Sequence, residues 1–382
     1  MATRFPLERF AQVETPFYYY DLDVLRLTLD TVVREAAKHD FVVHYAVKAN
    51  ANPRLLNEIR QAGLGIDCVS GGEVRCALEH GFDAKKIVFA GVGKSDWEID
   101  LALDADIECL NVESIPEMEV INERAMAKGR VADICLRVNP NVDAHTHQYI
   151  TTGMEENKFG IGLWEVEAAC RRAEELPCIN LVGFHFHIGS QITDMSAFQV
   201  LCTRVNELLR WAEEHKINLS VVNVGGGLGV DYEHPDEMPL PDFADYFSTF
   251  ARHLELRSGQ QVHFELGRSI VAQCGSLVTK VLYVKKGQKK QFAVVDAGMN
   301  DLIRPALYHA YHKIENISSA LPVEKYDVVG PVCESSDCFG KEIQLPAVSR
   351  GDLIALRSAG AYGETMASRY NLRKFAQGVY SD

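Results

Sequence analysis

The segment His44-Tyr45-Ala46-Val47-Lys48-Ala49-Asn50 ends an apolar, β-branched run that begins at Phe41, and this pattern predicts a buried strand followed by a loop. One lysine, Lys48, stands where the strand gives way to the loop. Low-dielectric walls at such a position disfavour the ammonium form and make a free amine available for a Schiff base. Most strand-end lysines are solvated caps, so the interpretation of Lys48 as a covalent attachment point depends on residues downstream.

The composition is that of a globular chain with room for two cores. Of its 382 residues 47% are apolar, and the formal net charge of -14 disfavours nucleic-acid and anionic-membrane partners. No uncharged apolar stretch is long enough to span a bilayer, and no secretory leader is evident. Ten cysteines, among them Cys68 and Cys135, lie mostly inside apolar runs. We therefore expect a cytoplasmic protein with reduced thiols that acts on small molecules.

Short apolar runs alternate with helical patterns along the first two thirds of the chain, which is typical of a parallel sheet covered by helices. Eight runs precede Gly267, and eight strands close a parallel barrel. The runs are Phe41–Val47, Leu64–Val69, Lys86–Val92, Ile107–Val112, Ala132–Val138, Ile179–Ile188, Leu219–Val224 and Val262–Leu266. The expected helices include Leu22–His39, Pro53–Gln61, Gly72–His80, Ile115–Lys128 and Ala197–His215.

The fold prediction is an α/β chain with a (β/α)8 TIM-type barrel over residues 22–268 and a β-rich domain, sandwich-like or barrel-like, over residues 269–382. We expect residues 1–21 to pack on the second domain. Its predicted strands are Ser276–Val284, Gln291–Asp296, Tyr326–Val332 and Asp352–Arg357. The alternative for the first domain is an open doubly wound sheet, which needs a switch point and usually has fewer strands. The connection from Asn139 to Leu163 is too long for a passive turn and suggests a functional loop.

The unusual residues of the chain follow the predicted strands. Catalytic groups of such barrels gather at the C-terminal ends of the strands, so this placement favours the barrel over the open sheet. The segments are Lys48, Asp67 with Ser70-Gly71-Gly72-Glu73, His187-Ile188-Gly189-Ser190, Gly225-Gly226-Gly227 and Glu265-Leu266-Gly267-Arg268.

Several of these residues also have purely structural explanations. His185 and His187 alternate with phenylalanines and could be interior residues that only form hydrogen bonds. The glycine run lacks the spacing of dinucleotide folds and could be a tight turn, yet consecutive backbone N–H groups suit a phosphate monoester, helped by Ser190 and Arg268. Cys333 and Cys338 are too widely spaced for a typical structural zinc site, so we expect no metal.

A pyridoxal phosphate site needs a lysine, a phosphate cradle, a planar group to stack on the ring and a carboxylate to keep the pyridine nitrogen protonated. These parts are supplied by Lys48, Gly225–Gly227, His187 and Glu265. The segments Tyr45–Asn50, His187–Gln191, Gly225–Gly227 and Glu265–Ser269 resemble the signatures of fold-type III pyridoxal phosphate decarboxylases, along essentially the whole chain. Leu266 replaces the proline of the last signature, which affects only backbone geometry. The resemblance implies that further cofactor contacts come from Asp67, Ser190, Gly267, Arg268 and Tyr362.

The C-terminal segments narrow the resemblance. They are similar to the diaminopimelate decarboxylase family in Asp296–Asn300, Arg304–Tyr308, Cys333–Asp337 and Gly360–Tyr362. This resemblance implies decarboxylation of meso-2,6-diaminopimelate to L-lysine through a pyridoxal phosphate Schiff base, with Cys333 as the proton donor. It implies that the substrate is bound by Arg268, Arg304, Tyr308, Glu334 and Tyr362. It also implies a homodimer, in which Cys333 and Glu334 reach into the site of the partner subunit.

The chemistry of Arg304 supports this choice of substrate. A substrate with a carboxylate at both ends leaves one unreacted, and a guanidinium fork binds it by paired charge-assisted hydrogen bonds. A distal ammonium, as in ornithine or lysine, would be repelled. Three alternatives remain: a related decarboxylase acting on another amino acid or on a siderophore or antibiotic precursor, a racemase-like enzyme, and a non-catalytic cofactor carrier. The carrier would need neither the C-terminal domain nor Cys333.

Overall fold

The computed structural model describes residues 5–142 and 158–381. By its contacts the chain divides into two units. The barrel unit comprises Leu29–Gly229 and Asp242–Gly267, and the β unit comprises Met1–Thr28, Val230–Pro241 and Arg268–Asp382. The domain limits predicted from sequence, 22–268 and 269–382, stay a prediction. Most of the expected functional loop, residues 143–157, lies outside the described residues.

Eight parallel strands close a barrel in the order β2-β3-β4-β5-β6-β7-β8-β9. This finding confirms the predicted TIM-type barrel and excludes the open doubly wound sheet, because β2 pairs with both β3 and β9. Each strand matches one predicted apolar run, as expected for strands that are covered on both faces. The strands are β2 (Val42–Ala46), β3 (Gly65–Cys68), β4 (Ile87–Phe89), β5 (Cys109–Val112), β6 (Ala132–Arg137), β7 (Ile179–His185), β8 (Val221–Asn223) and β9 (Gln261–Leu266).

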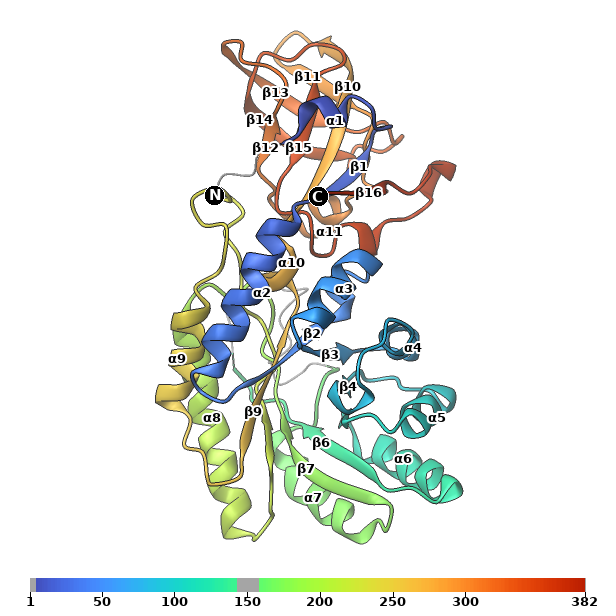
Figure 1. The fold of residues 1–382 in the computed structure, drawn as a ribbon, viewed down its shortest axis with the longest axis vertical. Helices are drawn as coiled ribbons and strands as arrows, with labels where there is room; N and C mark the ends of the chain where they lie inside the picture. Colours follow the sequence, from blue (N-terminus) through green and yellow to red (C-terminus); the bar gives the residue numbers. More distant parts are fainter. Residues whose placement is uncertain (1–4, 143–157, 382) are drawn as a thin grey trace. The chain divides into compact units, whose positions relative to one another are not determined.

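Helices follow the strands and cover the outside of the barrel (Figure 1). Several begin at a side-chain cap that also ends the loop after a strand. Asn52 caps α3 by accepting from the N–H of Arg54, and Ser70 caps α4 by accepting from that of Glu73. These caps fix the loops on which the predicted site residues lie. The helices are α2 (Leu22–Ala37), α3 (Pro53–Gln61), α4 (Gly71–Glu79), α5 (Asp96–Ala105), α6 (Ile115–Lys128), α7 (Val166–Glu175), α8 (Met195–Glu214) and α9 (Phe243–His253).

The β unit is built on one eight-stranded sheet, which confirms the predicted β-rich domain. Its strands run in the order β12-β15-β10-β11-β13-β14, and β1 pairs with β10 and β16. The strands are β1 (Phe17–Tyr20), β10 (Gly275–Lys286), β11 (Gln291–Val295), β12 (Ile314–Asn316), β13 (Val323–Val329), β14 (Cys338–Pro346), β15 (Leu353–Leu356) and β16 (Gln377–Tyr380). Short helices α1 (Leu7–Phe10), α10 (Arg268–Val271) and α11 (Arg304–Tyr308) complete the unit.

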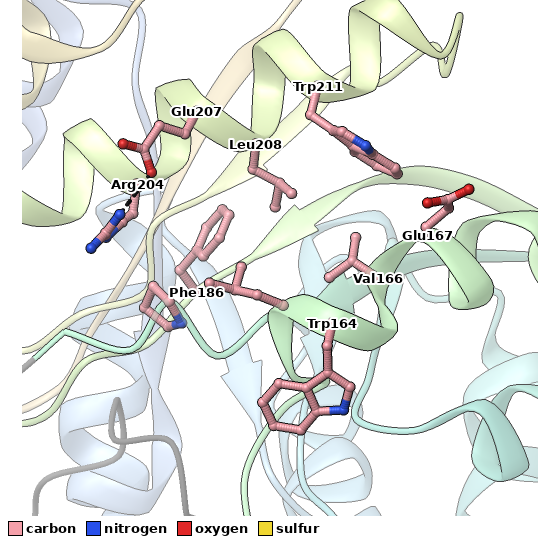
Figure 2. Close-up of a pocket in the computed structure, with 10 residues that line it drawn as sticks. Trp164, Val166, Glu167, Phe186, Arg204, Glu207, Leu208 and Trp211 are labelled. Carbon is pink, nitrogen blue, oxygen red and sulfur yellow. Dashed lines mark hydrogen bonds and ion pairs between the residues drawn. The ribbon is translucent and has the colours of Figure 1, made fainter.

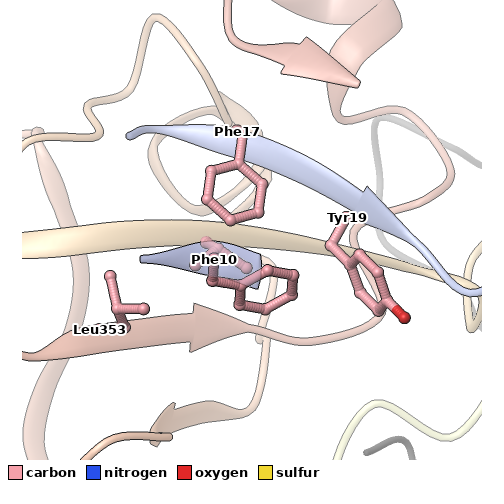
Figure 3. Close-up of a cluster of buried hydrophobic side chains, with 5 residues drawn as sticks. Phe10, Phe17, Tyr19 and Leu353 are labelled. Carbon is pink, nitrogen blue, oxygen red and sulfur yellow. The ribbon is translucent and has the colours of Figure 1, made fainter. Parts of the chain in front are cut away.

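An aromatic cluster joins the N-terminal segment to this sheet. Phe10 and Phe17 meet edge to face with ring centroids 5.0 Å apart, and Tyr19, Val278 and Leu353 complete the cluster (Figure 3). The rings of Phe10, Phe17 and Tyr19 are almost fully buried, so these three residues of the N-terminal segment are part of the core of the β unit. None of the helices in the described ranges combines the length and apolar character needed to span a bilayer.

Candidate active site

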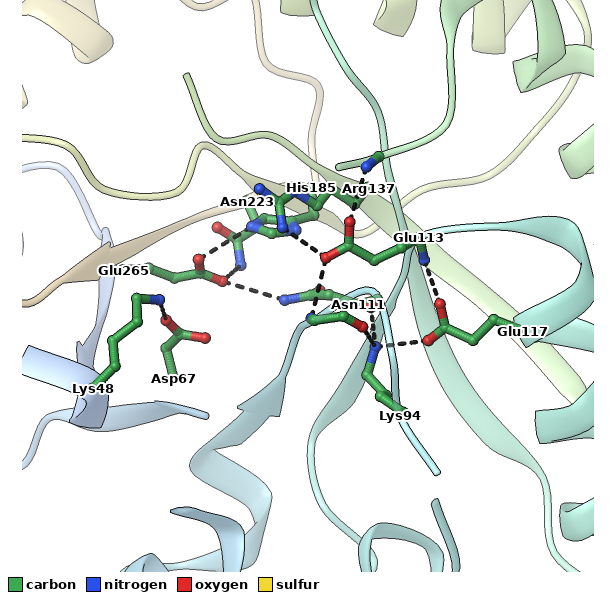
Figure 4. A network of polar contacts seen from close by, with 12 residues as sticks. Lys48, Asp67, Lys94, Asn111, Glu113, Glu117, Arg137, His185, Asn223 and Glu265 are labelled. Atoms are coloured by element: carbon green, nitrogen blue, oxygen red, sulfur yellow. Dashed lines mark hydrogen bonds and ion pairs between the residues drawn. The ribbon is translucent and has the colours of Figure 1, made fainter. Parts of the chain in front are cut away.

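Glu265, near the end of β9, is the centre of a polar cluster inside the barrel (Figure 4). Its Oε2 lies 3.1 Å from Nε2 of His185, and its Oε1 accepts hydrogen bonds from the side-chain amides of Asn111 (3.2 Å) and Asn223 (2.8 Å). Burial disfavours the charge, but His185, Lys48 and other neighbours outweigh it and hold the pKa of Glu265 well below its usual range. Glu265 is therefore a buried, ionised carboxylate.

Lys48 lies in the short helical turn Val47–Ala49 that follows β2. Its Nζ donates to Oδ2 of Asp67 at 2.9 Å. The Lys48 side chain is 37% exposed, so the expected desolvation by apolar walls is wrong, and Lys48 pairs instead with the buried carboxylate of Asp67. Burial and the charge of Glu265 raise the pKa of Asp67 to about 7 although Lys48 opposes the shift. We call Lys48, Asp67, His185 and Glu265 the barrel cluster.

His187 and the glycine run follow β7 and β8. The backbone N–H of Gly226 donates to Nδ1 of His187 at 3.3 Å, and that of Gly225 donates to Oδ1 of Asn223 at 2.9 Å. The expectation that all these N–H groups are open to a ligand is therefore wrong for two of the three glycines. Burial, then Arg137 and Lys48, lower the pKa of His187, so its ring is neutral.

Close packing explains why glycines occupy this run. A Cβ on Gly226 would come within 1.9 Å of the carbonyl oxygen of Glu265, and one on Gly227 within 2.9 Å of that of Gly189. Gly225 and Gly227 also have φ values of +68° and +106°, which L-residues rarely adopt. The run therefore brings the backbone next to Glu265.

Gly267 and Ser190, two further residues of the predicted site, also lie in the barrel unit. Gly267 packs against the residues that flank Lys48, because a Cβ there would lie 3.0 Å from that of Ala49 and 3.2 Å from that of Ala46. Ser190 is half-buried in the segment that follows β7. The structure thus collects on the barrel unit the predicted residues Lys48, Asp67, His187, Ser190, Gly225, Gly226, Gly227, Glu265 and Gly267.

Two buried ion pairs beside this cluster were missed by the sequence analysis. Lys94 Nζ lies 2.6 Å from Oε1 of Glu117, and Arg137 Nη1 lies 2.6 Å from Oε1 of Glu113 (Figure 4). Glu113 also accepts from the N–H of Gly160 at 2.8 Å and so ties down the end of the long connection. Glu113 directly follows a predicted strand, and Arg137 lies near the end of another, which was the available signal for this pair; for His185 the signal was the alternating Phe-His segment.

A second cluster lies in the β unit, around two buried arginines. The hydroxyl of Tyr232 accepts from Nη1 of Arg268 at 2.7 Å and from Nη1 of Arg304 at 3.1 Å. Arg304 Nη1 also lies 2.9 Å from Nε2 of His312. Burial lowers the pKa of Arg304. Among residues 5–142 and 158–381, no carboxylate forms an ion pair with Arg304, although it is only 6% exposed. We call these four residues the arginine cluster.

Tyrosines border the arginine cluster. Tyr308 ends α11, four residues after Arg304 and therefore on the same helix face. The guanidinium of Arg268 lies 5.0 Å from the ring centroid of Tyr362. Tyr362 has a φ of +57°, a left-handed conformation that is unfavourable for a bulky residue. Arg268, Arg304, Tyr308 and Tyr362 thus belong to one unit, together with Tyr232 and His312, which the sequence did not indicate.

Cys333 and Glu334 are exposed on a segment of the β unit that Asp337 holds. The carboxylate of Asp337 is 4% exposed and accepts from the N–H groups of Met299 (2.7 Å) and Val332 (2.6 Å). Glu334 itself accepts a hydrogen bond from the hydroxyl of Tyr370. The side chain of Cys333 is therefore exposed on the surface of an anchored segment.

The barrel cluster fits a pyridoxal phosphate group by its donor set. The group needs an amine and an anionic carboxylate, and Lys48 and Glu265 supply both in one interior. Two buried polar atoms there, Oδ1 of Asp67 and Nδ1 of His185, have no hydrogen-bond partner among the described residues. Buried polar atoms in a native site normally have one, so these two point to a bound group.

A separate cavity lies outside the barrel, between α7 and α8. It has a volume of about 370 Å³ and is lined by Trp164, Trp211 and other mainly apolar side chains, with the Arg204–Glu207 ion pair beside it (Figure 2). The barrel cluster contributes no residue to it.

Comparisons with known proteins agree with this geometry. Residues 29–272 match the family model of the pyridoxal-dependent decarboxylases, pyridoxal binding domain. A diaminopimelate decarboxylase of Bacteroides thetaiotaomicron is 60% identical, covering 99% of this chain and 98% of that protein. One from Helicobacter pylori is 43% identical over 96% of this chain and 90% of its own length. A crystal structure of the Helicobacter pylori enzyme complexed with L-lysine matches with a TM-score of 0.93 and 41% identity, covering 98% of this chain and 94% of the other.

The fold, the barrel cluster and the matched domain define a pyridoxal phosphate-dependent amino acid decarboxylase of fold type III. Within that class, the relatives to which it is similar over nearly its full length are diaminopimelate decarboxylases. The chain belongs to the diaminopimelate decarboxylase family.

Proposed function

We propose that this enzyme decarboxylates meso-2,6-diaminopimelate and releases L-lysine and carbon dioxide, the last step of lysine biosynthesis. The single observation that carries the choice of substrate is the buried guanidinium of Arg304, whose contacts to Tyr232 and His312 leave its charge without a carboxylate among the described residues. A distal carboxylate would neutralise it through charge-assisted hydrogen bonds. The names of the relatives and the L-lysine bound to the Helicobacter pylori enzyme support the same substrate and product.

The cofactor supplies an electron sink that lets the bond to the reacting carboxylate break. Lys48 would hold it covalently, and the ionised Glu265 would keep its ring nitrogen protonated. His187 would lie against the ring, while Ser190 and the Gly225–Gly227 run, with Arg268 and Tyr362, would contact the cofactor as the resemblance implies. Gly267 would leave room beside Lys48.

Asp67 has a role that follows from its contact with Lys48. The amine of Lys48 reacts only after it loses a proton, and Oδ2 of Asp67 lies 2.9 Å from Nζ. Because the pKa of Asp67 is raised to about 7, this carboxyl group can take up that proton near neutral pH. We infer that Asp67 prepares Lys48 for reaction.

Cys333 and Glu334 would act in the site of a partner subunit, which makes a homodimer the working unit. Support comes from their exposure on the segment that Asp337 anchors. Cys333 would donate the proton that replaces carbon dioxide, and Glu334, with Tyr308, would contact the substrate. We place the enzyme in the cytoplasm, where its ten cysteines, all thiols in this structure, would stay reduced.

Carbon dioxide release by the cofactor-loaded enzyme tests the substrate. We expect release from meso-2,6-diaminopimelate and little from lysine or ornithine, whose distal ammonium faces Arg304. A preference for either monocarboxylate would contradict the substrate and leave the decarboxylase class intact. A panel that includes larger amino dicarboxylates distinguishes related enzymes that act on siderophore or antibiotic precursors.

A further inference from the structure

We propose that the barrel carries a zinc site formed by His44, His263 and Glu108, on the side of the barrel cluster towards the N-terminal ends of the strands. His44 lies in β2 and His263 in the neighbouring strand β9, while Glu108 directly precedes β5. His263 and Glu265 alternate along β9, so they share a face, and His263 lies one repeat closer to the N-terminal end of the strand. No step of the proposed decarboxylation uses these three residues.

The three donor atoms face one another at distances suited to a small metal ion. Nε2 of His44 lies 3.1 Å from Nδ1 of His263 and 3.9 Å from Oε2 of Glu108. Nδ1 of His263 lies 3.7 Å from Oε1 of Glu108. Ligands about 2.0–2.1 Å from a tetrahedral zinc ion are about 3.3 Å apart, so small movements would complete the site. Two histidines and one glutamate are an established zinc donor set with an open fourth position.

Each histidine has one ring nitrogen that faces away from the site, and the contacts of that nitrogen determine whether the other one carries a lone pair that points into the site. Nδ1 of His44 lies 3.3 Å from the carbonyl oxygen of Lys86, which can only accept, so Nδ1 carries the proton. Nε2 of His263 lies 3.4 Å from Oε1 of Gln261, and donation there leaves the lone pair on Nδ1. Two lone pairs then face each other, and a cation between them removes the repulsion. Such outer contacts are typical of histidines that bind metals.

The surrounding residues make room for the site and leave it accessible. A Cβ on Gly65 would lie 2.4 Å from Nδ1 of His44, so glycine at this position admits the ring. His44 is fully buried, whereas the Glu108 side chain is 26% exposed and provides an entry path. The lysines closest to Glu108 have other partners: Lys86 donates to the carbonyl of Gly63, and Lys85 pairs with Asp106.

A bound ion would link separate parts of the barrel wall. β2 and β9 are neighbours, whereas β5 lies three strands from β2 in the barrel order. Because side chains at the N-terminal face of such barrels serve stability, we expect the ion to stabilise the barrel, with a water molecule in its fourth position. The metal-free alternative is a hydrogen-bond chain, in which Gln261 turns its amide to donate to His263, and His263 donates to His44.

Zinc titration of the holoenzyme, after removal of metal with a chelator, tests the proposal. We expect one Zn²⁺ per chain to compete with a chromophoric chelator, and Co²⁺ in its place to give the visible absorption of tetrahedral cobalt. Glu108→Gln and His263→Asn should each weaken zinc binding at least tenfold. His234→Asn is the matched control, because it removes an exposed histidine that lies 3.3 Å from Asp231 and leaves the barrel unchanged.

Equal zinc affinity in the wild type and all three variants would overturn the proposal, as would a wild type that binds no zinc more tightly than the chelator. Either result favours the hydrogen-bond chain through Gln261. His263 is buried and its variant can fail to fold, so the partly exposed Glu108→Gln then decides. Retained cofactor absorbance of that variant shows that its barrel is intact. Because neither readout depends on turnover, the result is independent of the proposed substrate.

Discussion

Nη1 of Arg304 lies 2.9 Å from Nε2 of His312, and the opposite ring nitrogen, Nδ1, lies 2.9 Å from the carbonyl oxygen of Arg357. A carbonyl oxygen only accepts, so Nδ1 carries the ring proton and Nε2 accepts from the guanidinium. His312 therefore orients Arg304 without neutralising its charge. This relationship leads to the first three predictions.

Arg304→Met should lower kcat/KM for meso-2,6-diaminopimelate by one to two orders of magnitude. A hydrogen bond to a charged group contributes about 1.5–3 kcal/mol, and about 1.4 kcal/mol corresponds to a factor of ten. Arg350→Met is the control, since Arg350 is exposed and lies 5.3 Å from the ring centroid of Tyr283. Steady-state kinetics measures both. An equal loss in the two variants would argue against a role of Arg304 in substrate binding.

His312→Phe should raise KM several-fold and leave kcat nearly unchanged, because it releases Arg304 without touching the reacting atoms. His312→Gln should restore part of the lost affinity, since its amide oxygen can accept from the guanidinium. A purely structural role would instead lower stability in both variants and leave the KM of the folded fraction unchanged.

His312 should also make the enzyme sensitive to acid. Burial, followed by the charges of Arg304 and Arg268, lowers its pKa to about 3, whereas the unfolded chain has the ordinary value of about 6.5. Below pH 6.5 the unfolded state binds a proton that the folded state does not, so stability falls as the pH falls towards 3. Urea unfolding measures the free energy of unfolding at pH 7 and at pH 5.5. Between these two values the free energy of unfolding of His312→Gln should fall by roughly 1 kcal/mol less than that of the wild type. An identical loss would show that His312 titrates normally in the folded state.

Borohydride reduction of the cofactor-loaded enzyme should leave a covalent label on the peptide that contains Lys48. Peptide mass spectrometry locates it, and Lys48→Ala should carry none. Lys94→Arg is a suitable control, because Lys94 is buried in the same unit and pairs with Glu117. We expect that variant to keep the label on Lys48, and a label at any other lysine would end the assignment.

Cys333→Ala should lower kcat strongly while the absorbance of the bound cofactor stays unchanged, because the thiol would act after the cofactor is in place. If Cys333 serves the partner subunit, mixing Cys333→Ala with Lys48→Ala under conditions of subunit exchange should restore activity. Each hybrid would then contain one complete site. No recovery, with hybrid formation shown by native mass spectrometry, would place Cys333 in its own chain's site.

The barrel could be predicted because its information is local. Each of the eight strands is an apolar run between turn residues, and the helices repeat with the expected period. The β unit was predicted less well: β1, β12, β14 and β16 were missed, and β13 begins three residues before the expected Tyr326. The four residues of β1 are all buried and therefore show no alternation, and β14 carries exposed polar residues along much of its length.

Some residues of the two clusters could not be predicted from the sequence, because only contacts with residues far away in the chain make them part of a site. Lys48 and Glu265 follow or end recognisable strands and were predicted, whereas Tyr232 and His312 become relevant only through their contacts with Arg304. Similarly, the prediction of no metal rested on the spacing of Cys333 and Cys338. Residues 44, 108 and 263 have no spacing that suggests a site, because barrel closure alone brings them together.

The segment Val230–Pro241, which connects β8 to α9, supplies Tyr232 to the arginine cluster and belongs by its contacts to the β unit. If Arg304 binds the far end of the substrate as proposed, selectivity for that end depends partly on this segment, which lies between two elements of the barrel in the sequence. Grafting the C-terminal portion alone onto another barrel of this class would transfer the arginines without the phenol they share. Redirecting such enzymes towards new amino acids therefore requires that both stretches be exchanged as one module.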